Sequence, residues 1–235
     1  MRFDVLTLFP DLIGQALSHS IVGRAIAEGR LEVVTTNPRD FANDKHRTVD
    51  DSPYGGGPGM VLMAPPIEAA LASLSLPDCP VILMDPAAPL FRQSDAHELA
   101  QMARVVVVCG HYEGTDERVR TQLCNRAYSI GDYVLTGGEL PALVMVDAIA
   151  RLLPGVLGHP ESFEDDSYEH GLLGHPVYTK PQVFREEAVP PVLLSGDHRK
   201  IDEWRRRQRL LRTRNLRPDL FVGAQLTPED VDLLG

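Results

Sequence analysis

Two glycine-containing stretches have the residue types of loops that bind a ligand through their backbone. SIGDYVLTGGEL (129–140) contains Gly131, Gly137 and Gly138 but no lysine or arginine, and GHYEG (110–114) follows a run of valines. Glycine lets backbone N–H and C=O groups approach a ligand closely. A phosphate-binding loop normally supplies a lysine or opens a helix with G-x-G-x-x-G, and neither occurs here. The stretches therefore suit an adenine ring and a zwitterionic ligand such as S-adenosylmethionine, although two tight turns around one strand would give the same pattern.

Acids and histidines gather in a second stretch. EDDSY places Asp165 and Asp166 close to His159, His170 and His175. Together these side chains could ligate a metal, but their spacing matches no metal-binding motif. A polar linker accounts for the same composition.

Two further features could belong to a site. HRTVDDSPYGGGPGM (46–60) is too long and too rich in glycine for a simple connection in a compact domain, with an ordinary long turn as the alternative. Arg151 is a lone charge near the end of a long apolar segment. Arginines at helix ends usually bind the last carbonyl groups, so Arg151 alone indicates little.

Basic residues gather near the C-terminus of a chain that is acidic overall. The net charge is −10, yet nine Lys or Arg residues lie between Arg199 and Arg217 against only two acids. This segment carries +7 and leaves −17 for the rest of the chain. Such asymmetry favours a surface that binds a polyanion, with a solvated basic helix as the alternative.

The first 150 residues alternate β-branched runs with helical patterns. This alternation predicts an α/β fold with a mostly parallel sheet that is covered on both faces. Ligands bind beyond the carboxyl ends of such strands, so VVVVCGHYEG indicates a strand that delivers loop 110–114 into a site. Ser94 and Thr115 are expected to be N-caps. The expected strands are 3–9, 31–37, 80–85 and 104–110, and the expected helices are 11–20, 21–29, 65–74, 94–103 and 115–124.

The remaining chain changes in character after a long apolar segment. ELPALVMVDAIARLLPG (139–155) predicts a helix that is either deep core or half of a subunit interface. An α/β domain is therefore expected over 1–157 and an irregular linker over 158–181. A small helical C-terminal domain is expected over 182–235.

The C-terminal domain has two helical patterns. IDEWRRRQRLLRTRN (201–215) predicts a helix with Ile201, Trp204 and Leu211 near one face and arginines around the others. LTPEDVDLL predicts a terminal helix that Thr227 caps.

The composition is ordinary for a globular protein, at 43% hydrophobic and 24% charged residues. No apolar run approaches the roughly 18 residues of a membrane span, and MRFDVLTLFPD lacks the regions of a signal peptide. Cys79, Cys109 and Cys124 form neither a C-x-x-C pair nor a disulfide framework, so a cytoplasmic location is expected.

Four motifs occur in one order along the chain: SPYGGGPGM, GHYEGTDERV, SIGDYVLTGGELPA and PGVLGH. With VPPVLLSGDH (189–198) and the arginine-rich helix, they closely resemble the bacterial tRNA (guanine-N1)-methyltransferases, the TrmD family of the SPOUT class. The resemblance runs through most of the chain. It implies a deep trefoil knot in the C-terminal part of the α/β sheet domain, and a homodimer whose sites are built from both subunits. It also implies methyl transfer from S-adenosylmethionine to N1 of guanosine 37 in tRNA.

The resemblance also implies roles for single residues. Asp166 matches the family's proposed general base, Arg151 the arginine that assists it, and Glu113 a position linked to the reacting guanine. The positions carried over for the cofactor are Pro86, Gly110, Tyr112, Ile130, Gly131, Asp132, Tyr133, Val134, Leu135, Gly137 and Gly138. Those carried over for tRNA are His46, Asp50, Arg205, Arg206, Arg207 and Arg209. No residue is assigned as a metal ligand, although the family's activity is associated with Mg²⁺.

The implied roles agree with the chemistry. Guanine N1 carries a proton at neutral pH, and a carboxylate within hydrogen-bond reach could remove it. A fixed arginine would then stabilise the charge that builds on the guanine oxygen. Two departures leave local contacts open: His111 replaces a more usual arginine, and MDPAAP (84–89) replaces a Ser-Pro-x-Gly type of loop.

Three other functions remain as alternatives. A SPOUT methyltransferase could act on another RNA, such as rRNA. A tRNA-binding protein could have lost turnover, although the presence of Asp166 and Arg151 argues against this. A metal-dependent hydrolase could use Asp165, Asp166 and the neighbouring histidines.

Overall fold

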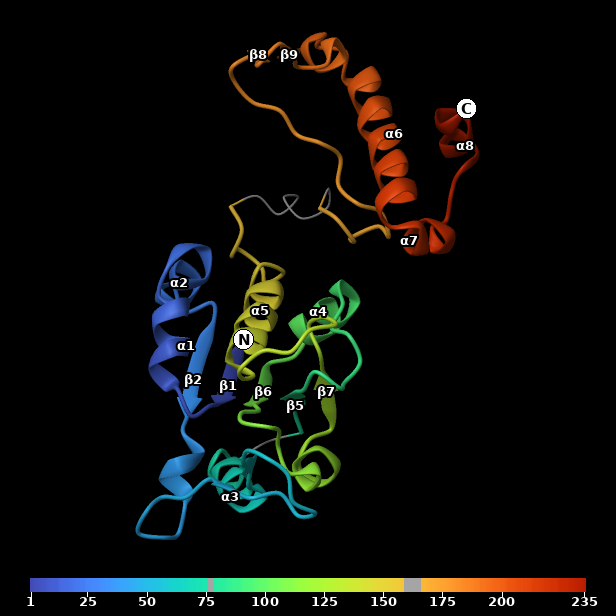
Figure 1. Cartoon of the computed structure of the whole chain (residues 1–235). Coiled ribbons are helices and arrows are strands. Elements are labelled where there is room, and N and C mark those ends of the chain that lie inside the picture. Colours follow the sequence, from blue (N-terminus) through green and yellow to red (C-terminus); the bar gives the residue numbers. More distant parts are fainter. Residues whose placement is uncertain (76–77, 159–165) are drawn as a thin grey trace. The chain divides into compact units, whose positions relative to one another are not determined.

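The computed structural model describes residues 1–75, 78–158 and 166–235. The chain divides into two compact units, Met1–Pro160 and Glu161–Gly235. Figure 1 shows the first unit in blue to yellow and the second in orange to red. In the described part of the chain, no helix is both long enough and apolar enough to cross a membrane.

A parallel sheet forms the centre of the first unit. Its five strands have the order β2-β1-β6-β5-β7, and each neighbouring pair is parallel. This confirms the predicted α/β class with a mostly parallel sheet. The sequence missed β7, because three residues are too few to show a strand pattern. The strands are β1 (Arg2–Leu6), β2 (Glu32–Thr36), β5 (Val81–Met84), β6 (Arg104–Cys109) and β7 (Arg126–Tyr128).

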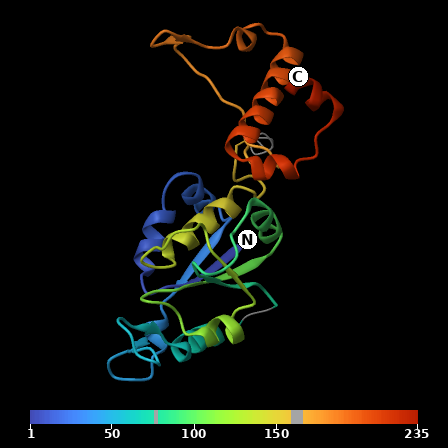
Figure 2. The same cartoon turned by 45° about the vertical axis from the view of Figure 1, so that its right-hand side comes forward.

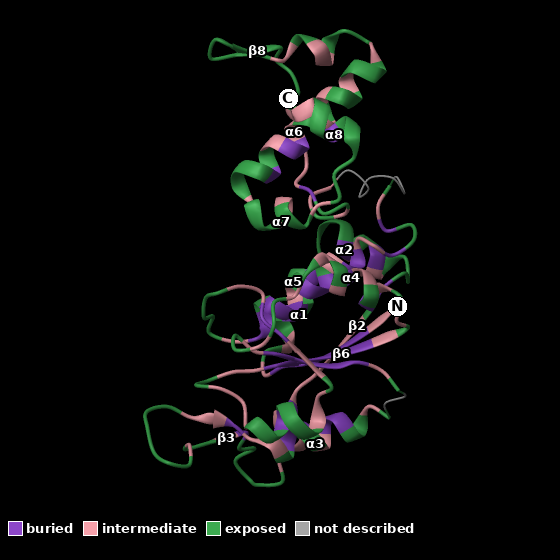
Figure 3. Cartoon of the chain, turned by 90° about the vertical axis from the view of Figure 1, so that its right-hand side faces the viewer, coloured by how far each residue is buried: buried purple, intermediate pink, exposed green. Residues whose placement is uncertain are grey.

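Helices cover both faces of this sheet (Figure 3). Val105 and Val107 belong to one core cluster, and Val106 and Val108 to the cluster on the opposite face. Because both faces are covered, β6 appears in the sequence as an unbroken apolar run. The first cluster includes residues of α1 (Pro10–Leu17), α2 (Ser20–Ala27), α4 (Gln93–Ala100) and α5 (Glu139–Ala150), and the second includes residues of α3 (Ala64–Ser73).

Shorter elements complete the first unit. The strands β3 (Asp50–Asp51) and β4 (Val61–Leu62) pair antiparallel, η1 (Pro38–Phe41) is a 3₁₀ helix, and η2 (Val119–Leu123) is a π-helix. All three cysteines are free thiols.

Two predicted N-caps are wrong. The helix α4 begins at Gln93, where the Asp95 carboxylate accepts the N–H of Arg92 at 2.7 Å, so Ser94 lies inside the first turn. In the segment predicted as helix 115–124, Asp116 instead of Thr115 accepts a backbone N–H, that of Arg118 at 2.9 Å. Asp and Thr are both good capping residues, so composition could not choose between Thr115 and Asp116.

The apolar helix is also shorter than predicted. Helix α5 ends at Ala150, and Arg151 occupies its C-cap position. Turns follow it up to Pro154 and Gly155.

The second unit is built around the long helix α6 (His198–Leu216). Helix α7 (Pro218–Gly223), helix α8 (Pro228–Leu234) and the 3₁₀ helix η4 (Pro191–Leu194) contact it (Figure 2). The hydroxyl of Thr227 accepts the N–H of Asp230 at 3.2 Å, which confirms the predicted cap. The strands β8 (Val183–Phe184) and β9 (Glu187–Ala188) form a small hairpin.

Candidate functional site

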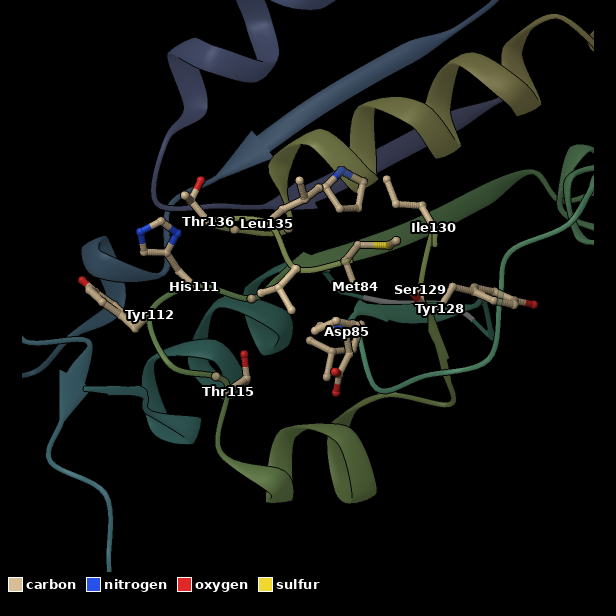
Figure 4. A pocket seen from close by; sticks show the side chains of 18 of the residues that line it. Met84, Asp85, His111, Tyr112, Thr115, Tyr128, Ser129, Ile130, Leu135 and Thr136 are labelled. Carbon is tan, nitrogen blue, oxygen red and sulfur yellow. The ribbon is translucent and has the colours of Figure 1, made fainter. Parts of the chain in front are cut away.

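A cavity of about 310 Å³ opens at the carboxyl ends of three neighbouring strands, β5, β6 and β7 (Figure 4). Its lining comes from the segments that follow these strands: residues 83–86, 110–115, 128–130 and 133–138, with Pro141 of α5. Because parallel strands end at one edge of a sheet, segments far apart in the sequence meet here.

Backbone hydrogen bonds fix the course of the loop 129–138. Where the loop begins, Ser129 N–H donates to Pro89 C=O at 2.9 Å, and Phe91 N–H donates to Ser129 C=O at 2.8 Å. Where it ends, Gly138 N–H donates to Gly110 C=O at 2.8 Å. The loop is therefore held between the segment after β5 and the segment after β6.

Two glycines at the end of this loop are required by close packing. A Cβ added at Gly138 would lie 2.8 Å from both Cys109 Cα and Gly110 N, closer than packed atoms tolerate. A Cβ at Gly137 would meet the Glu139 carboxylate and His111 Nδ1. The glycines thus allow the loop to touch the end of β6.

The stretch 46–60 joins the same site. Leu62 N–H donates to Gly114 C=O at 2.9 Å, and Glu113 N–H donates to Met60 C=O at 3.0 Å. The Glu113 side chain fills the space above Gly59, whose φ of +81° also favours glycine. Two stretches that lie about 50 residues apart in the sequence therefore form one wall.

Tyr112 connects this wall to β3. Its φ of +63° is unusual for a residue with a side chain. Burial, together with a hydrogen bond to Asp50, raises the pKa of the Tyr112 phenol, and Arg39 beside it acts in the opposite direction. Asp50, predicted to bind tRNA, thus lies next to a predicted cofactor residue.

A polar cluster that no sequence pattern indicated adjoins the cavity, which His111 helps to line. The His111 ring packs against the rings of Phe9 and Tyr112, with centroids 5.1 and 4.9 Å away. The buried carboxylate of Glu139 accepts a hydrogen bond from Thr7 Oγ1 at 2.8 Å. The departure at position 111 was the only signal, since nothing in the pattern links Thr7 to Glu139.

Most predicted cofactor residues line the cavity, and so does Glu113; the exceptions are Gly131 and Asp132. Gly131 lies under the ring of Tyr133, so it supports the lining, and Asp132 is exposed. Residues that the sequence analysis did not assign to the cofactor also line the cavity: Met84, Asp85, Thr115, Tyr128, Ser129 and Thr136. They flank the predicted positions, and Met84 and Asp85 belong to the loop 84–89 in which this sequence departs from the family.

The charged residues of this lining are acidic. Among the described residues, Asp85 and Glu113 are the only Asp or Glu side chains that line it, and no lysine or arginine does. Apolar groups are accessible at the opening, where Val134 is 81% exposed. Such a cavity suits a ligand that combines an apolar ring with positive charge and carries no phosphate.

The two residues predicted for proton transfer belong to different units. Arg151 is the C-cap of α5, where its backbone N–H donates to Asp147 C=O at 3.3 Å. Asp166 lies in the second unit, where its backbone carbonyl accepts a hydrogen bond from Arg209 Nη2 at 3.2 Å. Within the described residues, no group of three or more His, Cys, Asp or Glu could hold a metal ion. Asp165 and His159 lie outside the described residues.

The structure corrects the prediction for Arg209, because this residue is only 6% exposed and cannot meet RNA phosphates from the surface. Two neighbours also hold the fold: Arg206 pairs with Asp230, and Arg207 Nε donates to Leu233 C=O at 3.0 Å. Arg205 is exposed beside Asp202. His46, the remaining tRNA prediction, is exposed in the loop before β3.

Comparison with known proteins places the chain among relatives of one kind. The family described as "tRNA (Guanine-1)-methyltransferase TrmD" matches residues 1–223. Three similar relatives are each named tRNA (guanine-N(1)-)-methyltransferase. The protein of Synechococcus sp. (strain JA-3-3Ab) is 53% identical over 100% of this chain and 93% of its own. Those of Moorella thermoacetica and Staphylococcus aureus (strain JH9) are 54% and 51% identical, over 98% and 100% of this chain and 94% and 96% of their own.

Proposed function

The chain belongs to the tRNA (guanine-1)-methyltransferase TrmD family, and we propose from this that it transfers the methyl group of S-adenosylmethionine to N1 of guanosine 37 in tRNA. The observation that carries the proposal is the cavity at the ends of β5, β6 and β7. Its glycine-containing walls offer backbone edges to an adenine ring, and its acidic side chains, Asp85 and Glu113, suit a sulfonium and an ammonium group.

The proposed mechanism divides proton transfer and charge stabilisation between two side chains. S-adenosylmethionine supplies a methyl group that its own sulfonium activates. Asp166 accepts the proton of guanine N1, so that the nitrogen lone pair becomes available to attack. Arg151 stabilises the negative charge that develops on the guanine oxygen, and Glu113 contributes to holding the base.

We propose a homodimer with shared sites because α5 leaves an apolar surface uncovered. Leu140 and Val144 lie one turn apart on this helix and are 53% and 48% exposed. Leu12 of α1, a helix that packs against α5, is exposed as well. A second copy of the chain would remove these side chains from water. The site would then combine the cavity and Arg151 of one chain with Asp166 of the other.

We also propose the deep trefoil knot of the SPOUT class for the first unit. Its support is the course of loop 129–138, which is hydrogen-bonded both to Pro89 and Phe91 and to Gly110. Circular permutation tests this arrangement, because opening the chain inside loop 129–138 would remove a knot without removing any side chain. Full cofactor binding in that variant would contradict the knot.

Asp166→Asn tests the catalytic assignment. The amide keeps the shape of the side chain but cannot accept the proton, so the single-turnover methylation rate should fall by about two orders of magnitude or more. The affinity for S-adenosylmethionine should stay the same. Asp165→Asn is the control for loss of one negative charge in this segment, and it should cost far less. Mapping the methylated base in unmodified tRNA tests the position; methylation at a site other than guanosine 37, or an unaffected rate in Asp166→Asn, would contradict the proposal.

Mixed dimers test the shared site. One subunit carries Asp166→Asn and the other carries Gly138→Ala, which disturbs the cavity. If each site combines Asp166 of one chain with the cavity of the other, both defects fall in one site and the second site is intact. The mixed dimer should then regain about half of the activity, whereas sites built from one chain would leave it as inactive as its parents.

A further inference from the structure

We propose that Arg209 is a positioning residue for the general base: it holds the backbone of Asp166 from inside the second unit and so sets where that carboxylate stands. The inference rests on the proposed role of Asp166. It gives Arg209 a role in placing the general base, whereas the resemblance implied contact with tRNA.

The contact itself is direct. Arg209 Nη2 donates to the carbonyl oxygen of Asp166 at 3.2 Å, and the Arg209 side chain is almost fully buried. A guanidinium keeps its charge at any accessible pH, so in the interior it must be satisfied by acceptors. A hydrogen bond from a charged donor is stronger than a neutral one, and low polarity strengthens it further. The hydrogen bond from Arg209 therefore stabilises the position of the Asp166 backbone.

The same turn of α6 also binds the other end of the segment 166–174, which begins at Asp166. The fully buried Thr213 hydroxyl accepts Leu173 N–H at 2.9 Å while donating to Arg209 C=O at 2.7 Å. Arg212 Nη1 donates to Gly174 C=O at 3.3 Å. The segment 166–174, which the sequence predicts to be part of a linker, is thus hydrogen-bonded at both of its ends to one turn of α6.

Contacts inside the segment make it compact. Tyr168 N–H donates to Leu172 C=O at 2.8 Å, and the Leu172 side chain is buried in the unit. Gly174 N–H donates to Ser167 Oγ at 2.9 Å. Asp166 consequently lies at the edge of a compact turn that is hydrogen-bonded to α6 at both of its ends.

A double-mutant cycle separates positioning from a general structural role. Arg209→Met removes the donor and keeps an apolar side chain in the interior. In the otherwise native chain, the single-turnover rate should fall by about 10- to 100-fold, the scale expected for a misplaced catalytic group. In the Asp166→Asn background the same change should cost less than about twofold, because the group that Arg209 positions is already absent. Dissociation constants for S-adenosylmethionine and tRNA should change little.

Other outcomes would overturn the inference. Equal losses in both backgrounds would show that Arg209 acts on the fold, and a matching loss of tRNA affinity would show that it binds RNA. Arg185→Met removes the same charge from the β8–β9 turn of this unit and should leave the rate unchanged. If Arg209→Met does not fold, Thr213→Val replaces it in the double-mutant cycle with Asp166→Asn, because valine lacks the hydroxyl that accepts Leu173 N–H. An unaffected rate in Asp166→Asn alone would instead refute the proposed function.

Discussion

Arg206 of α6 and Asp230 of α8 form a bidentate ion pair, in which Nε and Nη2 each lie 2.7 Å from one carboxylate oxygen. Asp230 also accepts the N–H of Thr227 at 3.0 Å, so the same carboxylate caps α8 and attaches it to α6. The hydrogen bond from Arg206, aided by that of Thr227, lowers the pKa of Asp230 to about 2.

This pair predicts a pH dependence of stability. Because the pKa of Asp230 is lower in the folded state than in the unfolded chain, its contribution is present above about pH 4 and is lost as the pH falls towards 2. Asp230→Asn should cost about 2 kcal/mol in the free energy of unfolding at pH 7 and should flatten the loss below pH 4. Urea unfolding followed by the fluorescence of Trp204, the single tryptophan, reports on this unit. Asp232→Asn in the same helix is the control, and equal effects of the two variants would contradict the assignment.

Gly138→Ala should disrupt cofactor binding through the backbone. The new Cβ would lie 2.8 Å from Cys109 Cα and Gly110 N, so loop 129–138 must move away from the end of β6. We expect the affinity for S-adenosylmethionine, measured by calorimetric titration, to fall by roughly 5- to 150-fold, in line with a cost of about 1–3 kcal/mol for overpacking. Gly14→Ala in α1 is the matched control, since no atom lies within 4 Å of its added Cβ and helices favour alanine. Unchanged affinity in folded Gly138→Ala would show that the cavity is not the cofactor site.

The structure also redefines which cations of α6 should bind tRNA. Arg199, Arg205 and Arg214 are exposed, and the first two make only surface ion pairs, with Glu203 and Asp202. Their replacement by glutamine should weaken tRNA binding and reduce its salt dependence by about one unit of slope per lost phosphate contact. Binding isotherms at several salt concentrations measure this slope. If the salt dependence of tRNA binding were the same in the variant and the native chain, these residues would belong to a solvated face.

Arg206→Gln serves as the contrast to that triple variant. It removes a cation from the same helix but breaks the pair with Asp230, so it should lower the stability of the second unit. If Arg206→Gln kept full stability but lost tRNA affinity, Arg206 would instead be assigned to the tRNA-binding surface.

The sequence by itself determined the α/β class, four strands of the parallel sheet and the glycine-containing loops that follow its strands. The valine run of β6 could be read as a strand covered on both faces, because a strand with two buried faces must be apolar throughout. The glycines after β6 and β7 marked the loops that form the cavity, since only glycine tolerates such close backbone approach.

Only the tertiary structure decided which of the remaining residues act together. Helical periodicity shows which residues share a face of α6, but arginines occupy most of its sides, so no pattern could tell that Arg209 faces inward while Arg205 faces water. The contact of Gly138 with Cys109, and that of Arg209 with Asp166, join residues 29 and 43 positions apart along the chain. Such contacts depend on how whole elements pack, whereas a sequence pattern reports only the few neighbours that one helix or strand brings together.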